Sequence, residues 1–296
     1  MGSRYHFNNR YQRLMMYALM LFLAYIFAFP LLFMLVSSFK PEAQIFKDLY
    51  SLRAILPSGE LSLDNYHAVF EKSNIVRFFY NSMFITGVSV LLGLLINSMA
   101  AFALARLRWK GQAWILAGII ALLIVPFEAI VIPLLMLVAK LPWIEWQDGQ
   151  LILAQSWLNS YHVQILPGVA NAFSIFLFYQ FFKDIPKDFD EAAAVDGASP
   201  LQIYWWIIVP MSKPVFATVA ILQFLTNWNQ YLWPVMVVQS EDVRPVMVGM
   251  QQFFGVDTSW GEVMAYATLI TLPVLAVFLL FQRRFVQSMA GAGIKG

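Results

Sequence analysis

The amino-acid sequence predicts an all-α membrane protein with six transmembrane helices. Of its 296 residues, 60% are hydrophobic and only 12% are charged, whereas soluble domains average about 25% charged residues. Apolar stretches recur along the chain, and each is long enough for the roughly 20 residues that a helix needs to cross a bilayer. The chain contains no cysteine, which excludes disulfides and thiolate chemistry.

Six stretches are predicted to span the membrane within one domain over residues 1–296. They are about 14–36, 78–104, 113–138, 161–182, 213–238 and 260–281. The first stretch is longer than the about 7–15 apolar residues of a signal peptide, so we expect a spanning helix there. Pro167 and Gly168 interrupt the start of the fourth stretch.

The segment 37–77 precedes the second span and is predicted to lie outside the membrane. Its sequence “LSLDNYHAVF” at 61–70 predicts a short amphipathic helix on the outer membrane surface. Either Ser62 or Asp64 is expected to cap this helix. A solvated loop is the alternative interpretation.

Basic residues predict which side of the membrane each polar segment faces. Of the 19 Lys and Arg residues, 12 lie at the N-terminus, in 105–112, in 183–213 and in the C-terminal tail, and seven lie in the other polar segments. The short loop 105–112 contains three basic residues and no acid. Because basic loops stay cytoplasmic, both termini are predicted to be cytoplasmic.

Motifs of common enzymes and metal sites are absent from the sequence. There is no GxxxxGK[ST] phosphate loop, no HExxH and no GxSxG. His6, His67 and His162 are too widely separated to suggest a metal site. The net charge is +2, and no basic run suggests nucleic acid. We expect no catalytic residue, metal or cofactor in this chain.

One acidic residue, Glu128 in “VPFEAIVIP”, lies within a predicted span. A charge at the bilayer centre costs about 2.5–3.5 kcal/mol, so Glu128 is a candidate for lining a solute path. Alternatively, it lies near the outer interface or bonds backbone groups freed by Pro126 and Pro133. The spans offer no second titratable residue for a proton relay.

The segment 186–210, between the fourth and fifth spans, begins with a predicted short helix. Pro186 ends the preceding helix, and Asp188 followed by Glu191 predicts a capping box. Three alanines favour helix, and Gly197 predicts a left-handed C-cap. A helix of about two turns is unstable alone, so it must dock on a partner.

A second helix is predicted to follow immediately. Ser199 is the expected N-cap, Pro200 the first helical residue and Gln202 the third residue of a capping box. This helix is predicted to run through Trp205 and Trp206 to Pro210, with the tryptophans near the membrane interface.

The same segment resembles the EAA loop of ATP-binding-cassette (ABC) importer permeases. The family pattern is EAA-x3-G-x9-I-x-L-P, and the sequence matches it from residue 191 to 210 except for Val209 in place of leucine. The resemblance implies a type I importer permease with a cytoplasmic coupling helix that contacts a separate ATPase. The residues implied for that contact are Glu191, Ala192, Ala193, Asp196 and Gly197. A surface helix that only caps the bundle is the alternative.

Two further stretches resemble carbohydrate permeases. “FLTNWNQYLWPVMVV” at 224–238 is similar to their fifth span, and 259–296 is similar to the last span and tail of MalG-like subunits. The latter resemblance implies that Gly291, Gly293 and Lys295 contact the ATPase, whereas a frayed terminus is the alternative. “AFALARLRWKG” at 101–111 is similar to the corresponding cytoplasmic turn.

Amides and aromatic rings near the end of the fifth span are candidates for the substrate path, because they suit sugar hydroxyls and sugar faces. They are Asn227, Trp228, Asn229, Tyr231 and Trp233. Packing between helices is the alternative. In the MalG-like family the loop before the last span contacts the binding protein, which implicates Gly255, Val256, Asp257 and Thr258. A plain connector is the alternative there.

The resemblance therefore predicts a multi-pass permease subunit of a binding-protein-dependent sugar or oligosaccharide importer in the bacterial inner membrane, with an alginate-type cargo among the options. Expected partners are the lipid bilayer, a second homologous permease, an ATPase dimer that binds ATP and Mg²⁺, and a periplasmic or extracellular binding protein. A permease for another solute, a secondary transporter and a membrane anchor without transport activity are the alternatives.

Overall fold

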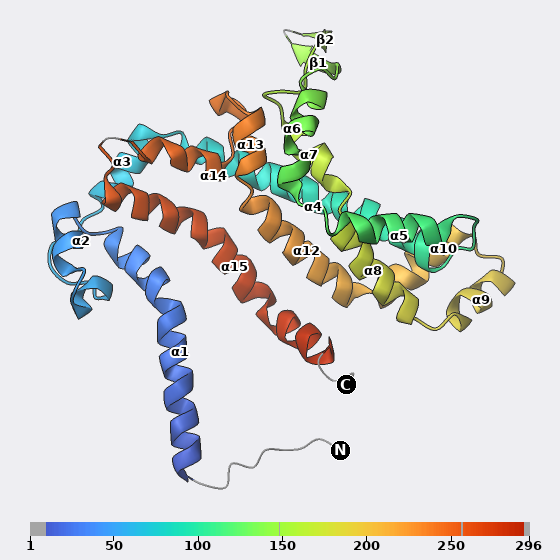
Figure 1. Ribbon diagram of the computed structural model, residues 1–296, viewed down its shortest axis with the longest axis horizontal. Helices are drawn as coiled ribbons and strands as arrows, with labels where there is room; N and C mark the ends of the chain where they lie inside the picture. Colours follow the sequence, from blue (N-terminus) through green and yellow to red (C-terminus); the bar gives the residue numbers. More distant parts are fainter. Residues whose placement is uncertain (1–9, 148, 256, 293–296) are drawn as a thin grey trace. The chain divides into compact units, whose positions relative to one another are not determined.

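The computed structural model describes residues 10–147, 149–255 and 257–292. The chain divides into two compact units. Unit 1 comprises Met1–Asn74 and Met250–Leu272, and unit 2 comprises Ile75–Gly249 and Pro273–Gly296. Helices dominate both units, as Figure 1 shows. The long helix α15 (Trp260–Ala292) begins in unit 1 and continues into unit 2.

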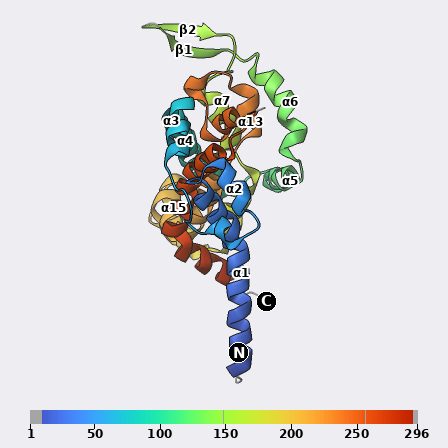
Figure 2. The same cartoon turned by 90° about the vertical axis from the view of Figure 1, so that its left-hand side faces the viewer.

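A β-hairpin in unit 2 corrects the prediction of an all-α fold. Strands β1 (Trp143–Gln147) and β2 (Gln150–Ala154) pair antiparallel, with Gln147 opposite Gln150. Figure 2 shows this hairpin beyond α6 and α7 of the same unit. The sequence “WIEWQDGQLILA” explains it, because Asp-Gly between aromatic and branched residues favours a two-residue hairpin turn. Gly149 accordingly has a φ of 79°.

Unit 1 begins with the predicted first span, α1 (Arg10–Ser37). Its most apolar stretch has no buried residue in the described structure, so this helix requires an apolar environment such as lipid. The remaining elements of unit 1 are α2 (Glu42–Asp48), a 3₁₀ turn (Leu52–Ile55), α3 (Asp64–Lys72), a second 3₁₀ turn (Met250–Phe253) and the start of α15.

The short helix predicted within 61–70 is confirmed as α3, but its predicted cap is wrong. Leu63 occupies the N-cap position, and no side chain caps the helix. The Ser62 hydroxyl instead accepts the N–H of Asp64, the first helical residue, at 3.4 Å. Asn65 then fixes α3 by donating to the carbonyls of Ser38 and Lys40 at 3.0 and 2.9 Å.

A buried ion pair holds the chain directly after α1. The ammonium of Lys40, whose side chain is 1% exposed, lies 3.0 Å from the carboxylate of Asp48, which is 7% exposed. The same ammonium donates to the carbonyl of Arg53 at 2.6 Å. The hydrogen bond from Lys40 lowers the pKa of Asp48 below its ordinary value of 3.8, although burial opposes this shift. The pair therefore ties α2 and the 3₁₀ turn to the end of α1.

Helix α4 (Ile75–Ala105) is the centre of unit 2, and it corresponds to the predicted second span. Helices α7 (Tyr161–Val169), α8 (Ala172–Asp184) and α12 (Lys213–Trp228) pack against it. The buried face of α4 carries several polar side chains, as expected where helices associate without help from water. They are Asn81, Ser82, Thr86, Ser89, Asn97 and Ser98.

Asn97 of α4 forms hydrogen bonds to the backbone at the junction between α7 and α8. Its side chain is fully buried and donates to the carbonyls of Gly93 and Val169 at 2.7 and 2.9 Å. Its oxygen accepts the N–H of Asn171 at 2.9 Å. Backbone groups that a helix break leaves unpaired need hydrogen-bond partners in a membrane. The Asn97 side chain pairs two such groups, one on each side of the break.

Three predicted spans are not single helices. The stretch 113–138 forms α5 (Gln112–Leu122) and α6 (Phe127–Val138), which are bent by 103°. The stretch 161–182 forms α7 and α8, bent by 42°. The fifth stretch contains α12 and α13 (Leu232–Val237), separated by residues 229–231. The expectation of a continuous helix at 113–138 is wrong because Pro126 disfavours helical geometry at the residue before it.

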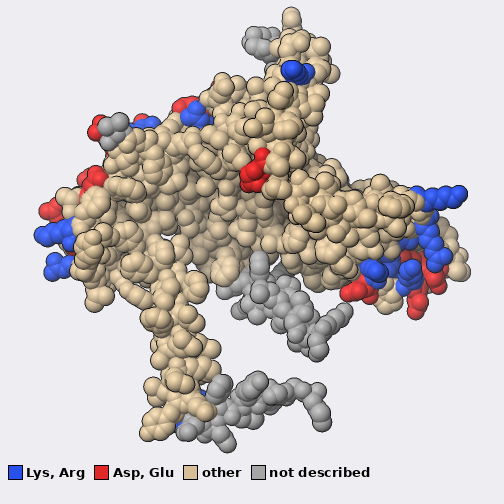
Figure 3. All heavy atoms as spheres, viewed as in Figure 1, with Lys and Arg blue, Asp and Glu red and all other residues tan. Residues whose placement is uncertain are grey.

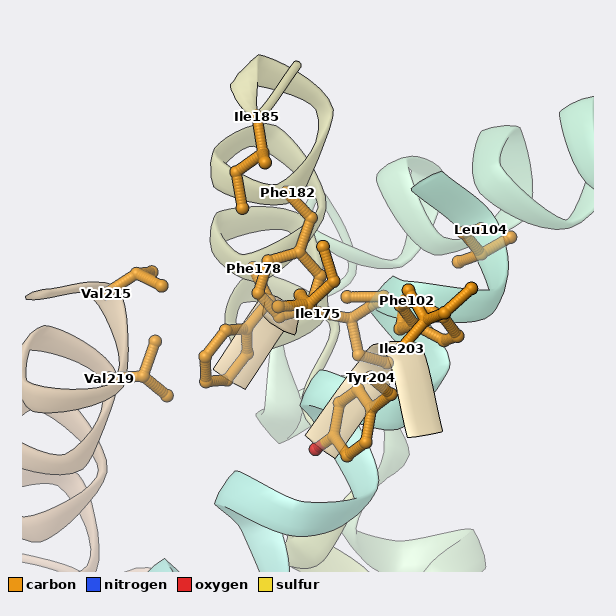
Figure 4. Packing of buried hydrophobic residues seen from close by; sticks show 12 residues of the cluster. Phe102, Leu104, Ile175, Phe178, Phe182, Ile185, Ile203, Tyr204, Val215 and Val219 are labelled. Carbon is orange, nitrogen blue, oxygen red and sulfur yellow. The ribbon is translucent and has the colours of Figure 1, made fainter. Parts of the chain in front are cut away.

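Apolar packing joins these helices around a core in unit 2. Figure 4 shows Phe178 and Phe182 of α8 beside Ile175, with Phe102 of α4 and Tyr204 nearby. The Phe102 and Tyr204 rings lie 5.4 Å apart, and the Tyr204 hydroxyl is 2.7 Å from that of Ser98. The segment after α9 is thereby anchored to α4.

We expect Asp48→Asn to lower the melting temperature of the purified protein at pH 7, because the Lys40 ammonium loses its charged partner. Since the pKa of Asp48 is lowered in the folded state, its contribution is complete above pH 3.8 and disappears as the pH falls through the lowered value. Melting curves of both proteins should therefore converge in acid. Asp64→Asn, at an exposed position of α3, is the control, and a constant difference at all pH values would contradict the assignment.

Candidate functional site

The candidate site is the helical segment between α8 and α12. Its first helix, α9, covers Asp188–Val195. The predicted cap is wrong by one residue: Lys187 occupies the N-cap position, Asp188 is the first helical residue, and no side chain caps the helix. The carbonyl of Lys187 accepts the N–H groups of Asp190 and Glu191 at 2.9 and 3.0 Å. Three acids in the first turn still complement the helix dipole.

Gly197 ends α9 as predicted. Its φ of 82° lies in the left-handed region, where a side chain is strained. The next N–H, of Ala198, reaches back to the carbonyl of Ala193 at 2.9 Å, and the N–H of Gly197 bonds the carbonyl of Ala194 at 3.1 Å. This pair of bonds is the Schellman arrangement, and it turns the chain sharply into the second helix.

The predicted start of the second helix, with Ser199 as its N-cap, is also confirmed. The N–H of Gln202 donates to the Ser199 hydroxyl at 3.4 Å, and the N–H of Ser199 donates to the Gln202 side chain at 2.7 Å. Pro200 is the first residue of α10 (Pro200–Ile203). One turn of π-helix (Tyr204–Ile208) and α11 (Val209–Met211) follow. The α10–α11 stretch is bent by 81° from α12.

Arg106, the residue after α4, holds α9 in place. Its Nε donates to the Asp190 carboxylate at 2.6 Å, and its side chain is only 1% exposed. Three of the other guanidinium N–H groups donate to the carbonyls of Phe182, Ile185 and Pro186 at 3.1, 2.6 and 3.1 Å. These carbonyls belong to the end of α8 and the turn after it. One cation therefore joins α4, α8 and α9.

On the side that faces away from Arg106, α9 is exposed. None of its residues is buried. Glu191, Ala192 and Asp196 are exposed, as are the apolar side chains of Phe189 and Val195, the latter to 88%. Figure 3 shows charged side chains of both signs gathered over the end of unit 2 that carries α9.

A cleft of about 300 Å³ lies along the inner side of α9. Arg106, Arg108 and Lys187 line it together with Asp190 and Glu191. An exposed helix with apolar and acidic side chains, anchored from behind by a buried cation, is suited to receive another protein. An isolated helix of this length would not form.

Arg106, Phe189 and Val195 were not singled out as site residues from the sequence. Arg106 contributed only to the prediction of membrane orientation. It lies 84 positions before Asp190, so no local pattern links the two. Phe189 and Val195 flank the EAA residues, and their exposure depends on which face of α9 packs inward.

The structure places two predicted substrate-path residues in the core. Trp228 is 1% exposed and packs against Phe79 and Phe224 at 5.7 Å. Trp233 is 2% exposed and donates from its ring N–H to the carbonyl of Val163 at 2.8 Å. Both rings thus serve packing between helices, and we do not retain these two residues as candidates for solute contact.

The other predicted path residues are described by their own contacts and exposure. Asn227 and Asn229 donate to carbonyls of their own helix at 2.8 Å, those of Gln223 and Leu225. Tyr231 is 41% exposed. Glu128 is exposed in the first turn of α6.

The loop and tail residues predicted for partner contacts are partly described. In unit 1, the Thr258 hydroxyl accepts the N–H of Gly255 at 3.0 Å and donates to its carbonyl at 2.8 Å, which closes a turn. Asp257 is exposed in this turn, and Val256 lies outside the described residues. Gly291 belongs to α15, whereas Gly293 and Lys295 lie outside the described residues.

We expect Arg106→Met to release α9, because the change leaves the Asp190 carboxylate and three carbonyls without a donor. The free energy that holds α9 in place should fall by about 3 kcal/mol, which is the lower end of the range for a broken buried ion pair, because the Asp190 side chain is 20% exposed. Amide hydrogen exchange of residues 188–195 measures this local opening. Arg108→Met, exposed at the same cleft, is the control. Unchanged exchange in Arg106→Met would contradict the anchoring role.

Relatives match this chain over almost the whole length of both sequences. An arabinooligosaccharide permease, AraQ of Halalkalibacterium halodurans, is 32% identical over 280 residues, which are 93% of this chain and 94% of the relative. The lactose permease LacG of Rhizobium radiobacter is 32% identical and covers 96% of this chain and 97% of its own. The trehalose/maltose permease MalG of Thermococcus litoralis is 29% identical, over 93% and 94%.

A solved structure has the same fold. It is a chain of a bacterial ABC transporter involved in the import of the acidic polysaccharide alginate, with a TM-score of 0.76 and 22% identity over 95% of this chain and 99% of that one. The family described as binding-protein-dependent transport system inner membrane component matches residues 89–291. That match covers more than half of the chain and includes the whole of α9, and the chain belongs to this family of membrane permease subunits.

Proposed function

We propose that this chain is a permease subunit of a carbohydrate ABC importer and that α9 is its coupling helix. The observation that carries the proposal is the bare, acid-containing surface of α9, held from behind by Arg106. The chain lacks a phosphate loop, so ATP and Mg²⁺ would bind to a partner ATPase dimer. A second homologous permease and a solute-binding protein would complete the importer.

Six membrane crossings and cytoplasmic termini form part of the proposal. Three helices, Arg10–Ser37, Ile75–Ala105 and Trp260–Phe281, are each long and apolar enough to cross alone. The bent pairs α5–α6 and α7–α8 would each supply one more crossing as a broken span. The stretch 213–238, which begins at Lys213 and contains α12 and α13, would supply the last. In this arrangement α9 and the loop 105–112 face the cytoplasm, as the basic residues of 105–112 and those flanking α9 in 183–213 favour.

Movement of α9 would be transmitted to α8 and to the end of α4 through hydrogen bonds. Arg106 bonds both Asp190 and the last carbonyls of α8, so a push on α9 is transmitted to α8 and to the end of α4. On the other side, Gly197 and the Ser199 cap lead into the bent stretch before α12. Closure of the ATPase would thereby rock these helices together and change access to the solute path.

Carbohydrate is the proposed cargo class because several relatives are named for it, including oligosaccharides of arabinose and the disaccharide lactose. One solved structure with the same fold is of an alginate transporter in complex with a periplasmic protein that holds an alginate pentasaccharide. We further propose that the turn at Gly255, Asp257 and Thr258, with Val256, contacts such a binding protein. The tail residues Gly291, Gly293 and Lys295 would contact the ATPase.

We expect Glu191→Lys to abolish most ATP-driven uptake in liposomes that contain the complete transporter. A reversed charge at a docking surface costs several kcal/mol, and each 1.4 kcal/mol is about tenfold in affinity. Co-purification of the ATPase with the permease should fall in parallel. Glu60→Lys, exposed in unit 1, is the matched control. Normal ATPase capture and uptake by Glu191→Lys would refute the coupling role.

Gly197→Ala should weaken coupling through the backbone alone. An added Cβ at Gly197 would meet no atom within 4 Å, but the left-handed φ of 82° remains, which costs about 1–2 kcal/mol for other residues. Faster amide exchange in α9 and reduced uptake are the expected results. Gly118→Ala, equally open but in the helix α5, should leave both unchanged. Equal amide exchange and equal uptake in the two variants would contradict a role for the Gly197 turn in coupling.

The cargo class is tested by identifying the binding protein that stimulates the reconstituted transporter. Stimulation by a sugar-loaded binding protein, and uptake of the labelled sugar, is the expected result. Stimulation only by a binding protein loaded with a polyamine, phosphate or metal would replace the carbohydrate assignment while leaving the coupling mechanism intact.

A further inference from the structure

An apolar groove in unit 2 is independent of the α9 surface. Its volume is about 620 Å³, and it lies between α4, the α11–α12 segment and the later part of α15. Gly87, Leu91, Phe216, Ala220 and Phe224 are among its lining residues. All of the lining residues are apolar or small except Lys213, which lies at the first position of α12.

The α12 side of the groove is about as long as one bilayer leaflet. From Lys213 to Phe224, α12 rises about 16 Å at 1.5 Å per residue. Half of the roughly 30 Å hydrocarbon core is about 15 Å. A groove that begins at a cation and runs along one leaflet of apolar lining matches the shape of a phospholipid, which has a charged head above an acyl chain.

The charged end of the groove lies on the side where anionic lipid is expected. Lys213 follows the α9–α11 segment, and under the orientation proposed above this end faces the cytoplasm. Anionic headgroups on that side attract basic residues next to membrane helices. The Lys213 side chain is exposed and has no ion-pair partner among the described residues.

Gly87 keeps part of the groove open. An added Cβ at this position would meet no atom within 4 Å. A larger side chain at Gly87 would therefore extend into open space instead of displacing the backbone. Small residues on the facing helix, Ala217 and Ala220, line the same groove.

We propose that this groove binds one acyl chain of an anionic phospholipid, with the lipid phosphate paired to the Lys213 ammonium. The bound headgroup then lies directly after the 81° bend between the α10–α11 stretch and α12. The proposal rests on the membrane orientation given above, but not on the identity of the transported solute.

The test uses the complete purified transporter after removal of bound lipid. Phosphatidylglycerol or phosphatidylcholine is added, and native mass spectrometry measures the lipid that remains bound and its apparent affinity. Wild type should retain a tightly bound phosphatidylglycerol that phosphatidylcholine does not replace. Lys213→Gln should bind it about fivefold more weakly, the loss expected for one basic residue near anionic lipid. Lys110→Gln, exposed in the loop 105–112, should bind like wild type.

A second pair of variants tests the apolar part of the site. Gly87→Leu fills the groove and should lose the tightly bound lipid, whereas Gly118→Leu, also facing open space but on α5, should keep it. Equal lipid retention by these two variants would overturn the proposal, as would equal affinities for the two lipids. If a helix of the partner permease fills the groove, Gly87→Leu will impair assembly while Lys213→Gln binds lipid normally, which also refutes it. Glu191→Lys should retain the lipid, so failure of coupling and failure of the lipid site are distinguishable.

Discussion

Arg106 places a planar cation at the point where α4 and α8 end and α9 begins. Its side chain is almost fully buried, and it donates to four acceptors at this junction: the Asp190 carboxylate and the carbonyls of Phe182, Ile185 and Pro186. A lysine could not satisfy these acceptors together, because it lacks the planar fork of donors. Arg106 and the packing of Ala193 against the core together hold α9 and leave its outer surface exposed.

Polar side chains inside the apolar bundle serve a related purpose. Asn97 bonds backbone groups at the α7–α8 break, and Asn81 donates to the carbonyls of Asp242 and Arg244 at 3.0 and 2.9 Å. In lipid, unpaired backbone groups cost several kcal/mol because water is absent. Broken spans are therefore tolerated where a neighbouring helix supplies an amide. Under the proposed coupling mechanism, the same breaks would allow the helices to move as separate segments when α9 moves.

The α11–α12 segment connects the two surfaces considered for this permease. Its beginning follows the turn at Gly197, and its later part lines the apolar groove with Lys213 at one end. A ligand in the groove would contact the segment that α9 moves. Protein partner and lipid would then act on one bent element from different sides, without sharing a residue among those assigned to each site.

The sequence by itself determined the membrane class, the apolar stretches, the Gly197 turn, the Ser199 cap and the family, because hydropathy, turn chemistry and the EAA spacing are local properties. The Asp-Gly pair between β1 and β2 is also a local hairpin signal, but the prediction of an all-α fold did not use it. Only the tertiary structure decided that Trp228 and Trp233 pack in the core, that 113–138 bends by 103°, and that Arg106 reaches Asp190. These outcomes depend on which residues distant in sequence come together, and periodicity in a single helix carries no information about its neighbours.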